Sequence, residues 1–321
     1  MGNITKNLQN RETLNNIIQK AFHGTKTIVT CKELPEGFCN AAYEIALSDG
    51  KTIILKISPD KAVRLMSCEV EMMQTEVKAM QLVKEKQAVG VAEVFYYDNS
   101  RELCSGEYFL MEKLEGQPCI AAKQEMKQEE QAAIDFEIGR NLRKLHDIKG
   151  QKFGHFCEKE LQFDTWYDAF YSMISRMIAD GISENIQIGV PYDVLLKTLE
   201  SDKSYFDEVK EPTMIHFDSW EGNIFVSKGE INGFIDWERA LWADGLMEDR
   251  FRYHSVNDNF LKGYGKESLT ESEQVRSLWY DVYLYLIMMF EVTFRQYETD
   301  DQYKWVRGLF EEVWNKIVER T

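Results

Sequence analysis

The stretch "MIHFDSWEGNIFVSKGEINGFIDWE", Met214 to Glu238, places acidic, amide and imidazole side chains in and around short apolar runs. Three of these runs predict strands, over residues 214–217, 223–227 and 231–236. Polar groups in a buried hairpin are costly unless they are hydrogen-bonded. The stretch is therefore either a polar turn between strands or the working part of an enzyme.

The residues before this stretch predict a small lobe of mixed structure. Their patterns predict a helix over 11–22, strands over 26–34, 40–47 and 51–58, a long helix over 66–86, and two strands in "VAEVFYYD" and "EYFLMEKL". Apolar side chains recur along the long helix at spacings of three and four, from Met66 to Met80. Asp49 and Gly50 mark a hairpin turn between two of the strands.

The rest of the chain predicts a larger helical lobe. Helices are expected over residues 128–148, 164–180, 190–200, 271–298 and 303–320, and the only strong strand signals are those within the quoted stretch. We predict an α+β fold of two lobes, with an N-terminal nucleotide-binding lobe over 1–111, a hinge over 112–116 and a C-terminal catalytic and substrate-binding lobe over 117–321.

Composition excludes several classes of partner. The 321 residues carry 38 Lys and Arg against 54 Asp and Glu, a formal net charge of -16. Nucleic acids and anionic membranes are poor partners for such a chain, because binding them requires a basic surface. Six cysteines without a CxxC pair, and an N-terminus without a signal-peptide pattern, favour a reduced cytoplasmic location. The most apolar helix is interrupted by Glu291, so no membrane span is expected.

His216, Asp218 and Asn223 form the pattern H-x-D-x-x-x-x-N, and Asp236 follows the next pair of strands. Phosphoryl transfer needs a carboxylate that orients and deprotonates a hydroxyl, and oxygen ligands that hold Mg²⁺. Asp218 can be the base, and Asn223 and Asp236 can hold the metal, because a hairpin would bring them together. His216 is expected to brace the loop, and Glu221 reads as an ordinary turn residue. The alternative is a polar turn with no chemistry.

Lys56 lies within the apolar strand "TIILKIS", where a buried ammonium needs a partner. The long helix offers Glu69 and Glu76, and we favour Glu76 because it lies nearer the middle of the helix. Gly37 and Asn40 stand in the loop between the first two strands, where a nucleotide could be covered. That loop lacks the pattern G-x-G-x-x-G.

Taken together, these motifs resemble the aminoglycoside phosphotransferase family, the small-molecule branch of the protein-kinase-like fold. The resemblance rests on "EGFCNAAYEI", "ILKI", "TEVKAM", "YFLMEKLEGQP", "LRKLHDI", "IHFDSWEGNIFV" and "GFIDWERA". It implies ATP and Mg²⁺ as cofactors, Asp218 as the catalytic residue, Asn223 and Asp236 as metal ligands, and a Lys56–Glu76 pair. It also implies that main-chain groups of Glu112 and Leu114 hold the adenine.

Departures from the protein-kinase pattern favour a small-molecule acceptor. Phe217 stands where protein kinases usually carry Arg, "DWE" replaces "DFG", and no "APE" follows. The expected acceptor is a hydroxyl of a small molecule, of the aminoglycoside type or of the choline, homoserine or methylthioribose type. A non-catalytic nucleotide-binding regulator is the remaining alternative.

Acidic residues near the motifs bear on the charge of the acceptor. Glu238, Glu248 and Asp249 follow the second strand pair closely and would suit a cationic, amine-bearing acceptor, unless they are solvated helix faces. The resemblance also implies a terminal carboxylate at the acceptor site, which would fall near Thr321.

Overall fold

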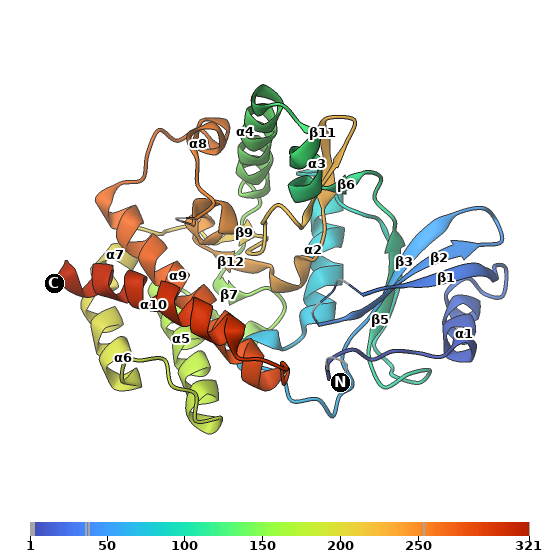
Figure 1. The fold of residues 1–321 in the computed structure, drawn as a ribbon, viewed down its shortest axis with the longest axis horizontal. Coiled ribbons are helices and arrows are strands. Elements are labelled where there is room, and N and C mark those ends of the chain that lie inside the picture. Colours follow the sequence, from blue (N-terminus) through green and yellow to red (C-terminus); the bar gives the residue numbers. More distant parts are fainter. Residues whose placement is uncertain (1–3, 36, 38, 253, 321) are drawn as a thin grey trace.

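The computed structural model describes residues 4–35, 37, 39–252 and 254–320. One lobe contains a five-stranded antiparallel sheet in the order β1-β2-β3-β5-β4 (Figure 1). Its strands are β1 (Ile28–Leu34), β2 (Ala41–Leu47), β3 (Thr52–Ile57), β4 (Val94–Asp98) and β5 (Tyr108–Glu112). All five were predicted from the sequence.

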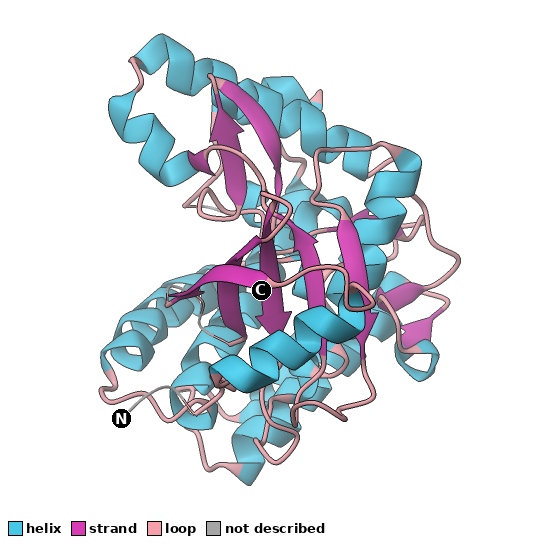
Figure 2. Cartoon of the chain, turned by 90° about the vertical axis from the view of Figure 1, so that its right-hand side faces the viewer, coloured by secondary structure: helices cyan, strands magenta, loops and turns pink. Residues whose placement is uncertain are grey.

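Helices cover both faces of this sheet, which explains why β3 is buried on both sides. Leu14, Ile17 and Ile18 of α1 (Arg11–Ala21) pack on the face formed in part by Ile53, Leu55 and Ile57. A helix can be seen lying across the strands in Figure 2. Successive residues of a strand point to opposite faces. Lys56 therefore points to the other face, with Ile54, where α2 (Met72–Lys86) packs.

The helix predicted over residues 66–86 is shorter than expected. A separate 3-10 turn, η1 (Ser67–Glu69), comes first, and α2 begins at Met72. The Glu69 carboxylate accepts a hydrogen bond from the Met66 N–H at 3.0 Å, which closes that turn. Glu71 then adopts a left-handed conformation with φ of 54°, so the helical hydrogen bonds cannot run through.

The other lobe is mostly helical, as predicted (Figure 1). Its helices are α3 (Cys119–Glu125), α4 (Gln128–Leu145), α5 (Trp166–Ser183), α6 (Tyr192–Ser201), α7 (Lys203–Phe206), α8 (Asp258–Tyr264), α9 (Glu271–Phe294) and α10 (Asp301–Glu319). The α+β prediction is thus confirmed. The short helices α3, α7 and α8 were not predicted.

The expectation that strands of this lobe lie only within residues 214–236 was wrong. Two small antiparallel sheets occur, β11-β10-β6 and β8-β7-β12-β9. Their strands are β6 (Gln117–Pro118), β7 (Phe153–His155), β8 (Gln162–Phe163), β9 (Thr213–Ile215), β10 (Ile224–Ser227), β11 (Glu230–Phe234) and β12 (Leu241–Ala243). The four strands that were missed have two or three residues each, too few to show a period.

The connector between β5 and β6 packs closely on the β10–β11 hairpin. Gly116 has a φ of +99°, and a Cβ there would stand 2.1 Å from the Val226 carbonyl oxygen. The Asn232 side chain donates to the Glu115 carbonyl at 2.9 Å. The predicted hinge therefore rests directly on the hairpin that carries the candidate site.

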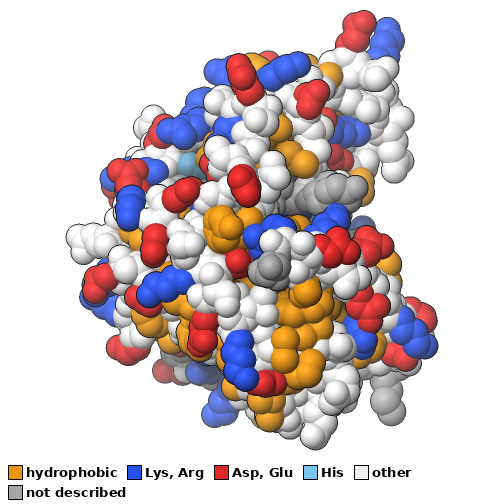
Figure 3. Space-filling model, turned by 90° about the vertical axis from the view of Figure 1, so that its left-hand side faces the viewer, with side chains coloured by type: hydrophobic (Ala, Val, Ile, Leu, Met, Phe, Trp, Pro, Cys, Tyr) orange, Lys and Arg blue, Asp and Glu red, His pale blue; other side chains and the backbone are white. Residues whose placement is uncertain are grey.

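The cysteines, the helices and the surface charges can be compared with what the composition predicts. All six cysteines are free thiols. Among the described residues, no helix combines the length and apolarity that a membrane crossing needs. Acidic and basic side chains are interspersed over the face of the helical lobe in Figure 3, which shows no continuous basic area.

Candidate active site

The loop after β9 carries Asp218, and two buried side chains, those of His216 and Glu248, hold this loop in place. The His216 ring is completely buried, and its Nε2–H donates to the Ile235 carbonyl at 2.9 Å. Burial lowers the pKa of His216, so the ring is neutral and braces the loop, as expected. Glu248 accepts from the His216 N–H at 2.6 Å and from the Ser219 hydroxyl at 2.7 Å. One carboxylate thus fixes the backbone on both sides of Asp218.

Asp218 and Asn223 are in direct contact. The Asn223 Nδ2 group donates to the Asp218 Oδ2 oxygen at 3.0 Å and to its carbonyl at 2.9 Å. Burial raises the pKa of Asp218 to about 7, an effect that the Arg239 guanidinium opposes. A carboxylate with a pKa near neutrality is suited to exchange a proton with a hydroxyl.

The β10–β11 hairpin brings Asp236 to the same place. Ile224 pairs with Phe234, and the Ile235 N–H donates to the Asn223 carbonyl at 2.9 Å. Asp236 follows with φ of 62°, a left-handed conformation that is rare outside glycine and often marks a functional position. The juxtaposition of Asn223 and Asp236 expected from the sequence is therefore present.

Lys56 joins the two lobes. Its ammonium lies 2.5 Å from Glu76 Oε1 and also forms an ion pair with Asp236. Burial opposes its charge, but Asp236 and Glu76 raise the pKa of Lys56 above its ordinary value. Of the two candidate helix carboxylates, Glu76 is the partner. Glu69 instead pairs with Arg295 at 2.7 Å.

Of the described residues in the loop between β1 and β2, Asn40 reaches the site with its side chain. The Asn40 Nδ2 group donates to Glu238 Oε2 at 2.8 Å. Burial raises the pKa of Glu238, and the Lys56 charge opposes this rise. Gly37 lies further out in the same loop and is exposed. Asn40 is thus brought to the cluster, whereas Gly37 is not.

The hinge residues proposed for adenine are only partly available. The Glu112 N–H donates to the Glu93 carbonyl at 2.8 Å. Any contribution of Glu112 is therefore limited to its carbonyl oxygen. Leu114 is partly buried and packs against the hydrophobic core that includes Phe234.

The donor set fits Mg²⁺. The two hydrogen bonds of the Asn223 side chain use its Nδ2 group and leave its Oδ1 oxygen for a ligand. Asp236 and Glu76 form ion pairs with the Lys56 ammonium, and Glu238 also acts on its charge, so carboxylate oxygens gather at this point. The described part of the chain contains no group of three His, Cys, Asp or Glu side chains arranged to hold a metal alone. Bound Mg²⁺ would complete its shell with phosphate oxygens and water, as it usually does.

Glu221 is not the ordinary turn residue expected from the sequence. Its carboxylate lies 2.6 Å from the Lys123 ammonium and 3.3 Å from the Arg250 guanidinium. Both cations also bind Asp135. The loop that carries Asp218 is therefore tied to α3, α4 and the segment after β12, through residues too distant in sequence for a local pattern to show.

The acids that favoured an amine-bearing acceptor are occupied inside the protein. Glu248 is completely buried and braces the loop, so its proposed contact with an acceptor was wrong. Asp249 is largely buried and accepts from the Ser255 hydroxyl at 3.0 Å. Glu238 is bound by Asn40. These residues thus give no independent support for a cationic acceptor. Thr321 lies outside the described residues.

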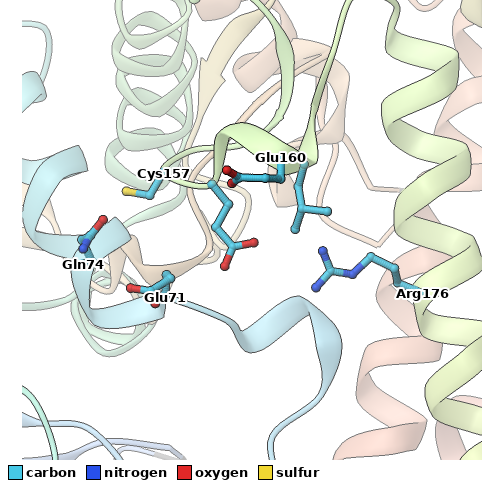
Figure 4. Close-up of a pocket in the computed structure, with 7 residues that line it drawn as sticks. Glu71, Gln74, Cys157, Glu160 and Arg176 are labelled. Carbon is cyan, nitrogen blue, oxygen red and sulfur yellow. The ribbon is translucent and has the colours of Figure 1, made fainter.

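A surface pocket lies beside the start of α2, away from Asp218. It is lined by Glu71, Gln74, Cys157, Glu158, Glu160, Leu161 and Arg176 (Figure 4). None of the residues predicted for the site contributes to it. A second, smaller cavity is lined in part by Phe217, Glu238 and Arg239, and so borders the candidate site itself.

Structural comparison identifies the fold as protein-kinase-like. The aminoglycoside phosphotransferase APH(4)-Ia, in a ternary complex with ADP and hygromycin B, is similar over 94% of this chain and 97% of its own, with a TM-score of 0.64 and 16% identity. The complex of APH(2")-IIa with streptomycin and ATP is similar over 95% and 97% of the two chains (TM-score 0.62, 13% identity). A Thermobifida fusca protein provisionally assigned as a fructosamine-3-kinase is similar over 95% and 100% (TM-score 0.63, 15% identity).

Sequence comparison gives the family. The model of the phosphotransferase enzyme family matches residues 30–248, which span most of the sheet lobe and the whole candidate site. The chain belongs to this family. No curated protein sequence matches it significantly.

Proposed function

We propose that this protein is an ATP-dependent phosphotransferase that moves the γ-phosphate to a hydroxyl group of a small molecule. The observation that carries the proposal is the contact set around Lys56, which pairs with Glu76 of one lobe and Asp236 of the other. Asp218 and Asn223 lie beside it in one braced loop. A phosphate-binding lysine, a base and oxygen ligands for Mg²⁺ are the parts that this chemistry requires.

Each residue has a distinct part in the proposed reaction. Asp218 accepts a hydrogen bond from the acceptor hydroxyl and takes its proton as the oxygen attacks the γ-phosphorus, while the bond from this phosphorus to the bridging oxygen breaks and ADP leaves. Lys56 binds phosphate oxygens with its ammonium and is held in place by Glu76. Asn223 and Asp236 supply oxygen ligands to Mg²⁺, which neutralises charge on the phosphates when it is bound. Most of the rate enhancement then comes from positioning and electrostatics.

An aminoglycoside-type antibiotic is one candidate for the acceptor, because solved relatives bind hygromycin B and streptomycin. A sugar-amine metabolite is a second, because another relative is provisionally assigned as a fructosamine-3-kinase. Both are small polyhydroxylated molecules, so the proposal names a hydroxyl acceptor without choosing between them.

A coupled ADP-release screen tests the proposal. The purified protein would be incubated with Mg–ATP and, in turn, with aminoglycosides, fructosamines, choline, homoserine and methylthioribose. We expect one class to stimulate ADP release and to yield a phosphorylated product by mass spectrometry. Tight Mg–ATP binding with no stimulation by any acceptor would favour a non-catalytic nucleotide-binding regulator instead.

A further inference from the structure

A chain of ion pairs, in which acidic and basic side chains alternate, connects three parts of the protein. It runs from η1, just before α2, to the end of α9 and then to the segment after Asp236. Arg295 Nη2 lies 2.7 Å from Glu69 Oε1 and 3.0 Å from Glu291 Oε1. The same Glu291 oxygen lies 2.8 Å from Arg239 Nη2. The chain thus joins three segments that are far apart in sequence, in the order Glu69, Arg295, Glu291 and Arg239.

These charges are unusually well hidden from water. Glu69 is 2% exposed and Arg295 is 3% exposed. Desolvating such ions is costly, and well-packed apolar side chains at the same positions are often at least as stabilising. Unlike apolar contacts, hydrogen-bonded ion pairs fix the geometry of the groups that they join. The burial therefore points to a positioning role rather than to stability alone.

The turn that contains Glu69 is also held by α5. The Ser67 N–H donates to the Asp180 carboxylate at 2.7 Å, and its carbonyl accepts from the Arg176 guanidinium at 2.5 Å. Figure 4 shows Arg176 extending from its helix near the segment that leads into α2. The residues just before α2 are thus fastened to the helical lobe, although α2 itself packs on the sheet of the other lobe.

We infer that Glu69 and Arg295 are positioning residues that hold α2 where Glu76 meets Lys56. Glu76 lies seven residues after Glu69, in the second turn of α2, so a shift of the first turn displaces its carboxylate. In protein kinases, phosphorylation of an activation loop controls this helix and its lysine–glutamate pair. Here the end of α9 supplies a permanent anchor. The inference rests on the proposed function for its catalytic meaning.

Arg239, at the other end of this chain of ion pairs, lies on the opposite side of the site. Arg239 belongs to η3 (Trp237–Arg239), which starts directly after Asp236. Its positive charge acts on Asp218 and opposes the rise in the pKa of that carboxylate. Because Glu291 binds both arginines through one oxygen, one side chain of α9 connects the turn before α2 with η3.

Three variants test this inference against a matched control. Arg295→Met removes the charge and keeps most of the volume, Arg295→Lys keeps the charge, and Glu69→Gln is a milder change if Arg295→Met does not fold. Arg276→Met is the control, because Arg276 is 4% exposed, lies on α9 and pairs with Asp244 at 2.8 Å, far from α2. The readouts are hydrogen exchange of the α2 amides in the ligand-free protein and the dissociation constant of Mg–ATP.

We expect Arg295→Met to speed hydrogen exchange of the α2 amides by about tenfold and to raise the dissociation constant of Mg–ATP by about tenfold. Both values correspond to the loss of one charged hydrogen bond. Arg295→Lys is expected to remain within about threefold of the wild type in both. Arg276→Met lowers overall stability but leaves α2 exchange relative to the rest of the chain unchanged.

Equal α2 exchange in Arg295→Met and Arg276→Met would overturn the inference, as would loss of α2 protection in Arg295→Lys equal to that in Arg295→Met. A wild-type protein that binds no Mg–ATP would contradict the proposed function instead. The exchange comparison needs no nucleotide, so it still decides whether Arg295 anchors α2.

Discussion

The two sides of the candidate active site are built in different ways. On the helical lobe, Asp218, Asn223 and Asp236 come from one continuous stretch, residues 214–238, and are joined by the β10–β11 ladder. On the sheet lobe, Lys56 and Glu76 come from a strand and a separate helix. The start of that helix is fastened to the other lobe through Arg295, a residue near the end of the chain.

This difference separates what local sequence can specify from what only the folded chain can. A hairpin fixes the spacing of its own side chains, so a local pattern is sufficient to place a base and its neighbours. A strand lysine and a helix glutamate have no shared register. They depend on distant contacts for their alignment.

Asp218→Asn should remove the base and leave the loop intact. The amide can still contact Asn223, but it cannot take a proton from the acceptor. Loss of general-base catalysis typically lowers turnover by about 10²–10⁴-fold. We therefore expect a fall of about 10³-fold in kcat, measured by ADP release at saturating acceptor. The exposed Asp207→Asn serves as control, and a fall of less than tenfold would show that Asp218 is not the base.

Glu248→Ala should destabilise the loop of the helical lobe that carries Asp218. The His216 N–H and the Ser219 hydroxyl lose their acceptor while remaining buried. Unsatisfied buried donors cost about 1–3 kcal/mol each, so we expect a loss of about 3 kcal/mol in the free energy of unfolding. Urea denaturation measures this loss, with the exposed Glu267→Ala as control. Equal stability of the two variants would contradict the bracing role.

Lys56→Met should weaken nucleotide binding by the sheet lobe. Removing the ammonium takes a charged hydrogen bond from the phosphates and leaves Glu76 buried without its partner. We expect the dissociation constant of Mg–ATP to rise by about 10- to 100-fold, the value of such a bond. Lys51 is exposed and lies directly before β3, the strand that carries Lys56. The control variant Lys51→Met should bind Mg–ATP as tightly as the wild type does. An unchanged constant in Lys56→Met would remove Lys56 from the nucleotide site.

The raised pKa of Asp218 also makes the stability of the protein depend on pH. Burial raises the pKa of Asp218 from 3.8 to about 7, so the folded protein holds a proton that the unfolded chain has released between these values. Stability is therefore lost as pH rises through this range, and this cost is absent below it. In the absence of Mg²⁺, Asp218→Asn should therefore be more stable than the wild type at pH 8, and its gain should grow as pH rises through this range.

Thermal unfolding at two pH values checks this sign. The gain of Asp218→Asn over the wild type should shrink to nothing near pH 3, below both pKa values, where the folded and the unfolded wild type both hold the proton. A gain that is independent of pH would mean that burial does not raise the pKa of Asp218.

Much of the site could be predicted from the sequence because its parts leave local signals. The alternation of β3 turns Lys56 towards α2, and the apolar runs around Asp218 and Asp236 mark the hairpin that unites them. The choice between Glu69 and Glu76 required the structure. The helix starts later than its apolar spacing suggests, because Glu71 interrupts it.

The supports of the site left no such signal. Glu248 acts on His216 from 32 residues away, and Arg295 binds Glu69 from 226 residues away. In sequence, both residues look like charges on or near helix surfaces, and Glu248 was mistaken for a possible acceptor ligand. Ion pairs between distant segments have no period, so only the folded chain reveals them.

The most direct test of the division between the two sides is the dissociation constant of Mg–ATP in Asp218→Asn, measured by titration calorimetry beside the wild type. If Asp218 acts on the acceptor and Lys56 on the nucleotide, the two constants should agree within about threefold despite the large loss of turnover. A loss of nucleotide binding that matches the loss of turnover would contradict this account and make Asp218 part of the nucleotide site.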